Sequence, residues 1–191
     1  MIILGGTSRT GKGLISQALM KLIEVPYISI DPLKMALVRS VPTYQLNPDG
    51  TSVSVSEELW PFISTLILNC VETGVEYIVE GEMLPKHVHE LSENHGVSVD
   101  ACFVGYKDIS ADEKVAQIRK HTGHPNDWTS GVSDAELYAL IEEGIQYSEY
   151  LSRECHTYGI RYIDFSTNFD EGKTETLAYL AARFQARHQT N

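Results

Sequence analysis

The sequence lacks any long uninterrupted run of apolar residues. Of its 191 residues, 42% are hydrophobic and 21% are charged, which is ordinary for a globular protein. No apolar stretch approaches the roughly 18 to 20 residues that a membrane-spanning helix needs. Residues 2–4 run directly into a glycine-rich loop and leave no room before it for a signal peptide. We therefore expect a cytoplasmic protein without a membrane partner.

Positive charge is also scarce. The chain has 15 Lys and Arg against 26 Asp and Glu, a formal net charge of -11 at pH 7. Proteins that bind nucleic acids along the phosphate backbone depend on clustered basic residues, so we expect no nucleic-acid partner. A small anionic ligand needs only a few converging cations. The positions of the basic residues therefore carry more information than their number.

Cysteine is present but has no metal-binding spacing. Cys70, Cys102 and Cys155 each stand in an apolar or helical context, where a reduced structural thiol is expected. Such thiols fit a reducing compartment. His121 and His124 are three residues apart, but no cysteine or further histidine nearby completes a zinc site. We expect no structural metal.

Apolar runs of strand length alternate with segments of helical periodicity. We predict strands at residues 2–4, 25–30, 77–79, 97–104 and 160–165, and helices at residues 12–24, 31–40, 56–73, 85–94, 110–121, 134–158 and 170–187. Asp31 is the predicted N-cap of the second helix, with Pro32 in its first turn. Residues 41–55 have no period and are predicted to form a surface loop. The alternation predicts one α/β domain over residues 1–191, with a parallel sheet covered by helices on both faces.

One motif follows the first predicted strand. Gly6, Gly11 and Lys12 match the pattern G-x-x-x-x-G-K, at the junction of a buried strand and a helix. In such a loop, backbone N–H groups and the helix N-terminus cradle phosphates, while the lysine neutralises their charge. We therefore predict nucleoside triphosphate binding by the loop. Its predicted contact residues are Gly6, Thr7, Ser8, Arg9, Thr10, Gly11, Lys12, Gly13 and Leu14.

The residues after the lysine depart from the general pattern. Gly13 and Leu14 stand where a Ser or Thr usually holds Mg²⁺. Thr10, Ser16 or, through a water, Glu80 are the candidates to hold the metal instead. Arg9 is unusual inside such a loop and reaches either a phosphate, a substrate or solvent.

Acidic residues follow two of the predicted strands. Ligands of doubly wound sheets bind beyond the carboxyl ends of the strands, where we expect Asp31, Glu80 and Glu82. An acid at the tip of a buried strand can accept a hydroxyl proton or hold a metal-bound water. Arg39 lies about two turns beyond Asp31 and is a candidate contact for an anionic acceptor. Helix capping by Asp31 and solvent exposure of Arg39 are the alternatives.

A polar, breaker-rich segment separates the helices predicted at residues 110–121 and 134–158. Arg119, Lys120, His121 and His124 bracket it, and cations on a closing flap would stabilise a transferring phosphoryl group. Arg153 is a second candidate clamp. Side chains after the last strand line an adenine pocket or cap the final helix. These are Asp164, Ser166, Thr167 and Asn168.

Taken together, these segments resemble the P-loop small-molecule kinases, the group that includes adenylate, shikimate and gluconate kinases, chloramphenicol phosphotransferase and 2-phosphoglycerate kinase-like proteins. The resemblance spans nearly the whole chain. It is carried by the loop at residues 6–13, by residues 28–31 with Arg39, by residues 77–81, by the polar flap at residues 119–131 and by residues 162–166. Gly13 resembles the G-K-G-T loops of adenylate kinases, although Leu14 replaces their threonine.

The resemblance implies a P-loop NTPase three-layer sandwich with strand order 2-3-1-4-5, and ATP with Mg²⁺ as cofactors. It also implies an acceptor-side region at about residues 31–75 and a lid at about 119–133. Lys12, Asp31, Glu80, Arg119 and Arg153 would carry catalysis, and Asp31, Arg39 and Glu82 would bind a small-molecule acceptor. A nucleotide-binding protein or slow NTPase without an acceptor is the alternative. The identity of the acceptor and the oligomeric state stay open.

Overall fold

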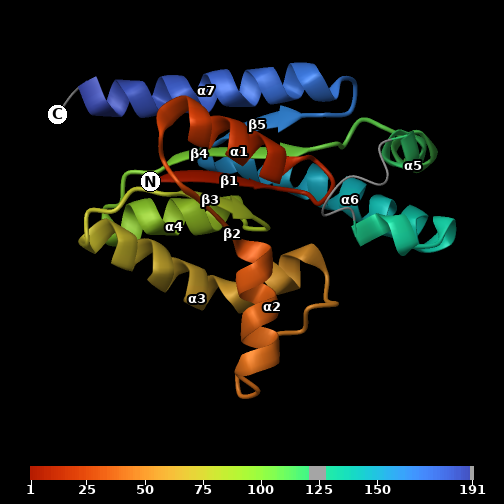
Figure 1. The fold of residues 1–191 in the computed structure, drawn as a ribbon, viewed down its shortest axis with the longest axis horizontal. Coiled ribbons are helices and arrows are strands. Elements are labelled where there is room, and N and C mark those ends of the chain that lie inside the picture. The colour runs from red at the N-terminus through yellow and green to blue at the C-terminus, as the bar shows by residue number, and fades with distance from the viewer. Residues whose placement is uncertain (121–127, 190–191) are drawn as a thin grey trace.

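The centre of the molecule is a parallel sheet of five strands. The computed structural model describes residues 1–120 and 128–189. Within them, β1 (Ile2–Gly6), β2 (Tyr27–Ser29), β3 (Ile78–Gly81), β4 (Asp100–Gly105) and β5 (Arg161–Asp164) pair in the order β2-β3-β1-β4-β5 (Figure 1). This order confirms the predicted α/β topology.

Helices cover both faces of the sheet (Figure 1). The helices α1 (Lys12–Ile23) and α7 (Phe169–Gln189) lie on one face, and α3 (Ser52–Glu72), α4 (Pro85–His95) and α6 (Asp134–Tyr158) lie on the other. The helix α2 (Ile30–Ser40) projects beside β2, and α5 (Ala111–Lys120) packs on α6 beyond the end of β4. A 3-10 turn over Trp128–Gly131 precedes α6.

The alternation of side chains along β1 divides the core in two. Ile2 and Leu4 pack with Ile15 of α1 against α7, while Ile3 packs with Leu59 against α3, α4 and α6. All five side chains are almost completely buried. A strand that is apolar on both faces belongs in the middle of a covered parallel sheet. This burial fixes the position of the end of β1, where the glycine-rich loop begins.

Two predicted helix starts were wrong. The helix α2 begins at Ile30 with Ser29 in the N-cap position, so Asp31 lies inside the first turn and is not the cap. The helix α3 begins at Ser52, so the last four residues of the predicted loop 41–55 are helical. The side chain of Thr51 caps α3 by accepting a hydrogen bond from the backbone N–H of Ser54.

The length and polarity of the helices bear on membrane insertion. Over residues 1–120 and 128–189, the structure contains no helix that combines the length and the apolar character needed to cross a bilayer.

Candidate functional site

The loop between β1 and α1 is shaped by two glycines. Gly6 has φ of 141°, and a Cβ atom there would lie 2.1 Å from the backbone oxygen of Val104. Gly11 is the N-cap of α1 with φ of 74°, and no side chain in the part of the chain that the structure describes caps this end of the helix. The first N–H groups of α1 therefore have no side-chain acceptor, which is the arrangement that binds an anion at a helix N-terminus.

The carbonyl oxygen of Thr7 holds the interior of the loop together. It accepts hydrogen bonds from the Lys12 ammonium and from the Thr10 hydroxyl, each at 2.8 Å. The hydroxyl of Thr7 is 2.8 Å from that of Ser148 on α6. Lys12, the predicted phosphate-binding cation, is only 9% exposed. The loop is therefore rigidly placed between β1 and α6 with its lysine folded inward.

Two further loop residues connect it to neighbouring parts of the site. The hydroxyl of Ser8 donates a 3.0 Å hydrogen bond to the carboxylate of Glu82, just after β3. Arg9 has φ of 63°, a left-handed conformation that is unusual for a residue with a Cβ atom. Its guanidinium is close enough to Tyr106 and Lys114 to affect their pKa values. Glu82 and Arg9 thus lie at the loop, as predicted.

Glu80 is the buried acid at the tip of the sheet. It is 7% exposed and pairs across the sheet with Ser29 of β2, whose side chain forms a hydrogen bond with it. Burial raises the pKa of the Glu80 carboxyl above its ordinary value, although Lys12 and Ser29 act in the opposite direction. Because the charge of Lys12 lowers the pKa of Glu80, the two side chains lie near each other. The structure therefore places the predicted acid beside the loop.

Asp31 and Arg39 are both exposed on α2. Asp31 is close enough to Glu80 to raise its pKa, and it forms a 3.7 Å ion pair with Lys34. Arg39 lies eight residues later in the last turn, which is about 12 Å along the helix axis. The structure brings Asp31 to the site, whereas any acceptor that touched both residues would have to extend along α2.

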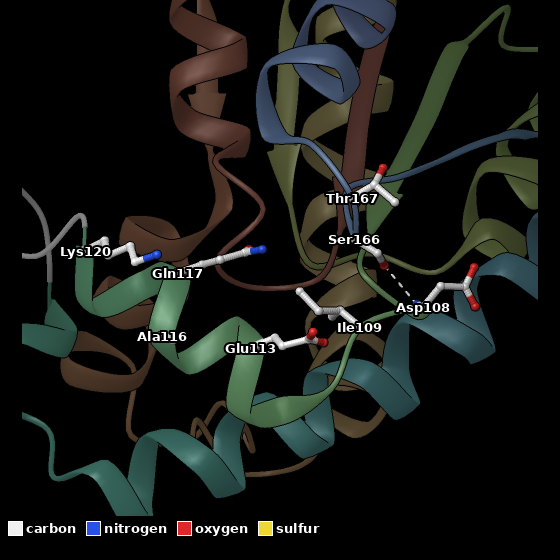
Figure 2. A pocket seen from close by; sticks show the side chains of 8 residues that line it. All are labelled: Asp108, Ile109, Glu113, Ala116, Gln117, Lys120, Ser166 and Thr167. Carbon is white, nitrogen blue, oxygen red and sulfur yellow. Dashed lines mark hydrogen bonds between the residues drawn. The ribbon is translucent and has the colours of Figure 1, made fainter.

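A hollow of about 470 Å³ opens between α5 and the turn after β5. In Figure 2, Gln117 extends from α5 toward the turn that carries Ser166 and Thr167, and the hydroxyl of Ser166 accepts a 2.9 Å hydrogen bond from the backbone N–H of Asp108. Ring atoms of Phe169 lie 2.6 Å from the position of a Cβ atom at Gly11, so this turn adjoins the loop. The hollow is lined by Asp108, Ile109, Glu113, Ala116, Gln117, Lys120, Ser166 and Thr167.

The hollow includes some predicted residues and excludes others. Ser166 and Thr167 line it, as the adenine-pocket interpretation required. Asp164 instead accepts hydrogen bonds from the backbone N–H groups of Lys107 and Ser166. Asn168 accepts hydrogen bonds from the backbone N–H groups of Asp170 and Glu171 at the start of α7, which is the capping alternative.

Arg119 joins the end of α5 to the start of α6. Its guanidinium donates to Asp134 and to the carbonyl oxygens of Thr129 and Val132, at 2.9, 3.0 and 2.7 Å. These bonds fix the segment that leads into α6. Contact with a phosphoryl group would require the side chain to exchange partners. The remaining flap cations, His121 and His124, lie outside the described residues.

Arg153 is exposed on α6, away from the loop. Ser148, which contacts Thr7, marks the face of α6 that packs on the sheet. Arg153 follows it by five residues, a rotation of about 140° and a rise of about 7.5 Å toward the end of the helix. The structure therefore does not bring Arg153 to the loop, and its predicted role as a clamp has no support from its placement.

The predicted Mg²⁺ contacts differ in their accessibility. Thr10 and Ser16 are completely buried, and within residues 1–120 and 128–189 the Ser16 hydroxyl has no hydrogen-bond partner. Leu14 is 58% exposed and carries no polar group. Glu80, beside Lys12, is the candidate with a charged oxygen at the tip of a strand. A carboxylate suits Mg²⁺, which usually keeps several waters and takes one or two protein carboxylates.

Sequence reasoning missed several residues of this site. Ser148 anchors the loop, Gln117 enters the hollow, and Lys114 is buried beside Tyr106. Each belongs to a helix whose apolar pattern predicts only its buried face. Their proximity to the loop depends on how α5 and α6 pack, so no local pattern in the sequence indicates it.

Comparison with solved structures shows the fold. A gluconokinase from Sinorhizobium meliloti 1021 superposes with a TM-score of 0.62 at 18% identity, covering 100% of this chain and 96% of that chain. A shikimate kinase from Bacteroides thetaiotaomicron gives a TM-score of 0.54 at 14% identity, covering 94% and 97%. A sugar kinase from Janibacter sp. HTCC2649 gives 0.53 at 18% identity, covering 94% and 93%.

These neighbours agree with the resemblance noted in the sequence. The chain has the fold of the P-loop small-molecule kinases over nearly its full length. No family model matches the sequence, and no curated protein matches it either. At such low identities the likeness establishes the architecture, and the chemistry has to be argued from the site itself.

Proposed function

We propose that the protein is an ATP-dependent kinase that transfers the γ-phosphoryl group to a small hydroxylated acceptor. The observation that carries the proposal is the placement of the buried acid Glu80 beside Lys12 of the phosphate loop. A binding loop alone would need no carboxyl group at the point where the phosphates end. Phosphoryl transfer needs positioned charge on both the triphosphate and the attacking hydroxyl.

The nucleotide would lie across the ends of β1, β4 and β5. The loop and the N-terminus of α1 would bind its phosphates, and Lys12 would leave the carbonyl of Thr7 to neutralise them. The base would enter the hollow between Gln117 and Thr167. Aliphatic and amide groups on α5 and hydroxyl groups on the turn suit a flat heterocycle with polar edges.

The acceptor would bind on the opposite side of the loop, between β3 and α2. Asp31 would orient its hydroxyl, and Glu80 would accept the proton or hold the metal water. The ion Mg²⁺, when bound, supplies charge neutralisation between the β and γ phosphates. Glu82 is held by Ser8 and would line the same side. Arg39 would meet only an acceptor that extends along α2.

The alternative function is nucleotide binding with slow hydrolysis and no acceptor. It is favoured by one observation: Gly13 and Leu14 provide no hydroxyl for Mg²⁺ after the loop lysine. Weak metal binding would slow phosphoryl transfer of either kind. The two functions differ in the fate of the γ phosphate.

That fate is measurable. ATP labelled in its γ phosphate would be incubated with the protein and a panel of sugars, polyols, nucleosides and their carboxylated or phosphorylated forms, and the products separated. The kinase proposal predicts label in one class of acceptor, in excess of label in inorganic phosphate. Label in inorganic phosphate alone, at a rate that no acceptor changes, would instead support the slow NTPase. The Lys12→Ala variant is the control for contaminating enzymes.

A further inference from the structure

Lys114 is a buried lysine that the proposed function does not use. It lies on α5 and is 6% exposed. Among residues 1–120 and 128–189, no side chain forms a hydrogen bond or ion pair with its ammonium group, which instead lies 4.4 Å from the centre of the Tyr106 ring. Burying an ammonium group without a hydrogen-bonded anion is unfavourable. The cation–π contact compensates for only part of this cost.

Tyr106 places this ammonium group next to the phosphate loop. The Tyr106 hydroxyl lies against Gly144, and a Cβ atom at Gly144 would also be 3.2 Å from the Thr7 methyl group. The backbone N–H of Tyr106 donates to Ser148, whose hydroxyl bonds Thr7. One aromatic ring therefore separates Lys114 from the loop.

Two cations converge at this place. Burial lowers the pKa of Lys114 first, and the charge of Arg9 lowers it further, to about 8. The nearby carboxylate Asp164 acts in the opposite direction, but it already accepts hydrogen bonds from Tyr162 and two backbone N–H groups. An anion bound between these two cations would relieve their mutual repulsion.

We infer that Lys114 and Arg9 form a second cationic position for the terminal phosphates of the nucleotide, on the α5 side of the loop. The inference rests on the proposed binding of a triphosphate. Lys12 would neutralise the phosphates from the α1 side, and the Lys114–Arg9 pair would neutralise them from the other. Such a pair would supply charge that the exposed Arg153 does not.

Protonation gives this inference a distinctive consequence. The groups that face Lys114 are Tyr106 beyond β4, Arg9 in the loop and Asp164 at the end of β5. Glu82 and Glu143 act on Tyr106 from the acceptor side. A bound phosphate would favour the charged ammonium and raise the pKa of Lys114. Near pH 8, ATP binding would then take up a fraction of a proton from solvent.

The test is calorimetric titration of ATP at pH 8 in two buffers of different ionisation enthalpy. The wild type should take up this fraction of a proton. Lys114→Met keeps the length of the side chain over Tyr106 but has no charge, so it should show no uptake and about tenfold weaker binding. Lys114→Arg stays charged at this pH, so it should bind within a few-fold of the wild type without proton uptake. Lys21→Met, an exposed lysine of α1, is the matched control.

The possible results separate this inference from the kinase proposal. Equal proton uptake by the wild type and Lys114→Met would overturn the role of Lys114, as would unchanged ATP affinity in a folded Lys114→Met protein. If the methionine variant does not fold, proton uptake that persists in Lys114→Arg overturns it. Titration with inorganic tripolyphosphate should give the same uptake, because the inference concerns phosphates. These binding results do not depend on any acceptor, so failure of phosphoryl transfer would leave them intact.

Discussion

Glu80 is a buried carboxyl group that faces a buried lysine across the mouth of the sheet. Its environment is dominated by desolvation, which favours the neutral form, while Lys12 and the Ser29 side chain favour the charged form. The pKa of the Glu80 carboxyl is higher in the folded protein than in the unfolded chain. Protonated Glu80 therefore stabilises the fold fully below about pH 4.5. That contribution is lost as pH rises through the raised pKa. Above that pKa, burial of the charged Glu80 carboxylate lowers the stability of the fold.

Replacing this carboxyl by an amide tests both its role and its cost. In Glu80→Gln we expect kcat for phosphoryl transfer to fall by about 10² to 10³ while the KM for ATP changes little. Wild-type kcat should also decline as pH falls through the raised pKa of Glu80. Urea unfolding between pH 4 and 8 should show less pH dependence in the variant than in the wild type. Identical pH dependence of stability in the two proteins would show that burial does not raise the pKa of Glu80.

The location of some site residues could be predicted from the sequence, whereas that of others could not. The loop was predictable because G-x-x-x-x-G-K is a local pattern with a known mechanism. Glu80 followed from its position after an apolar strand. Arg153 was not predictable in the same way, because its direction depends on the rotation of α6 about its axis. Lys114 gave no signal, since a lysine on a helix is ordinarily solvent-exposed.

At the level of elements, the contact between α6 and the end of β4 holds the phosphate loop. Gly144 lies on the buried face of α6. A Cβ atom there would lie 2.2 Å from the hydroxyl of Tyr106. One turn later, Ser148 bonds both Thr7 and the backbone of Tyr106. The closeness of α6 to the sheet at Gly144 is what allows Ser148 to reach the loop.

We expect Gly144→Ala to push α6 away from Tyr106. The free energy of unfolding should fall by about 1 to 3 kcal/mol, because the rigid ring cannot make room without moving the helix. The affinity for ATP should fall as well, since Ser148 would lose its contact with Thr7. Gly131→Ala is a suitable control, since no atom of the described residues lies within 4 Å of its Cβ position. A Gly144→Ala protein that is as stable as this control would refute the proposed tight contact.

The elements themselves were largely predictable. Apolar runs located all five strands, and helical periodicity located the helices. The helix α6 begins after Ser133, in a capping box with Glu136. The start of α3 was missed because residues 52–55 continue a polar segment without periodicity and were assigned to the loop at residues 41–55. Burial of Val55 with Leu59 one turn later decides in favour of a helix. Local pattern and tertiary packing disagreed there, and packing prevailed.

At the scale of the whole molecule, a buried ionic cluster ties α7 to the edge of the sheet opposite the phosphate loop. Asp100 opens β4, and its side chain is 4% exposed. It accepts hydrogen bonds from Arg187 at 2.9 Å and from Arg183 at 3.3 Å. Arg187 also pairs with Glu76, which lies just before β3. The cluster therefore joins the last helix to two central strands.

We expect Arg187→Met to destabilise the fold by about 2 to 4 kcal/mol, because among the described residues it leaves the buried Asp100 carboxylate paired only with the mostly exposed Arg183. Arg161→Met removes the exposed pair with Glu175 and should cost less than about 1 kcal/mol. Denaturant unfolding measures both. Because the cluster lies at the amino ends of the strands, ATP affinity should stay unchanged in folded Arg187→Met. Equal losses of stability in the two variants would show that the buried cluster contributes no more than a surface pair.

The architecture as a whole was predictable because strand and helix signals alternate along the entire chain, which leaves few topologies. The hollow beside α5 was only partly predictable. Ser166 and Thr167 are placed by the end of β5, whereas Gln117 and Glu113 reach the hollow through the packing of a helix far away in sequence. The residues that were missed are therefore those whose position depends on packing between elements distant in sequence.

Titration of Mg-ATP into wild type and Lys12→Ala tests the phosphate loop most directly. In the proposed function, the buried Lys12 ammonium neutralises the phosphates. Its removal should weaken ATP binding by at least about tenfold, whereas Lys21→Ala on the exposed end of α1 should bind as the wild type does. Equal affinity of the wild type and Lys12→Ala would contradict triphosphate binding at this loop, and with it the proposed kinase.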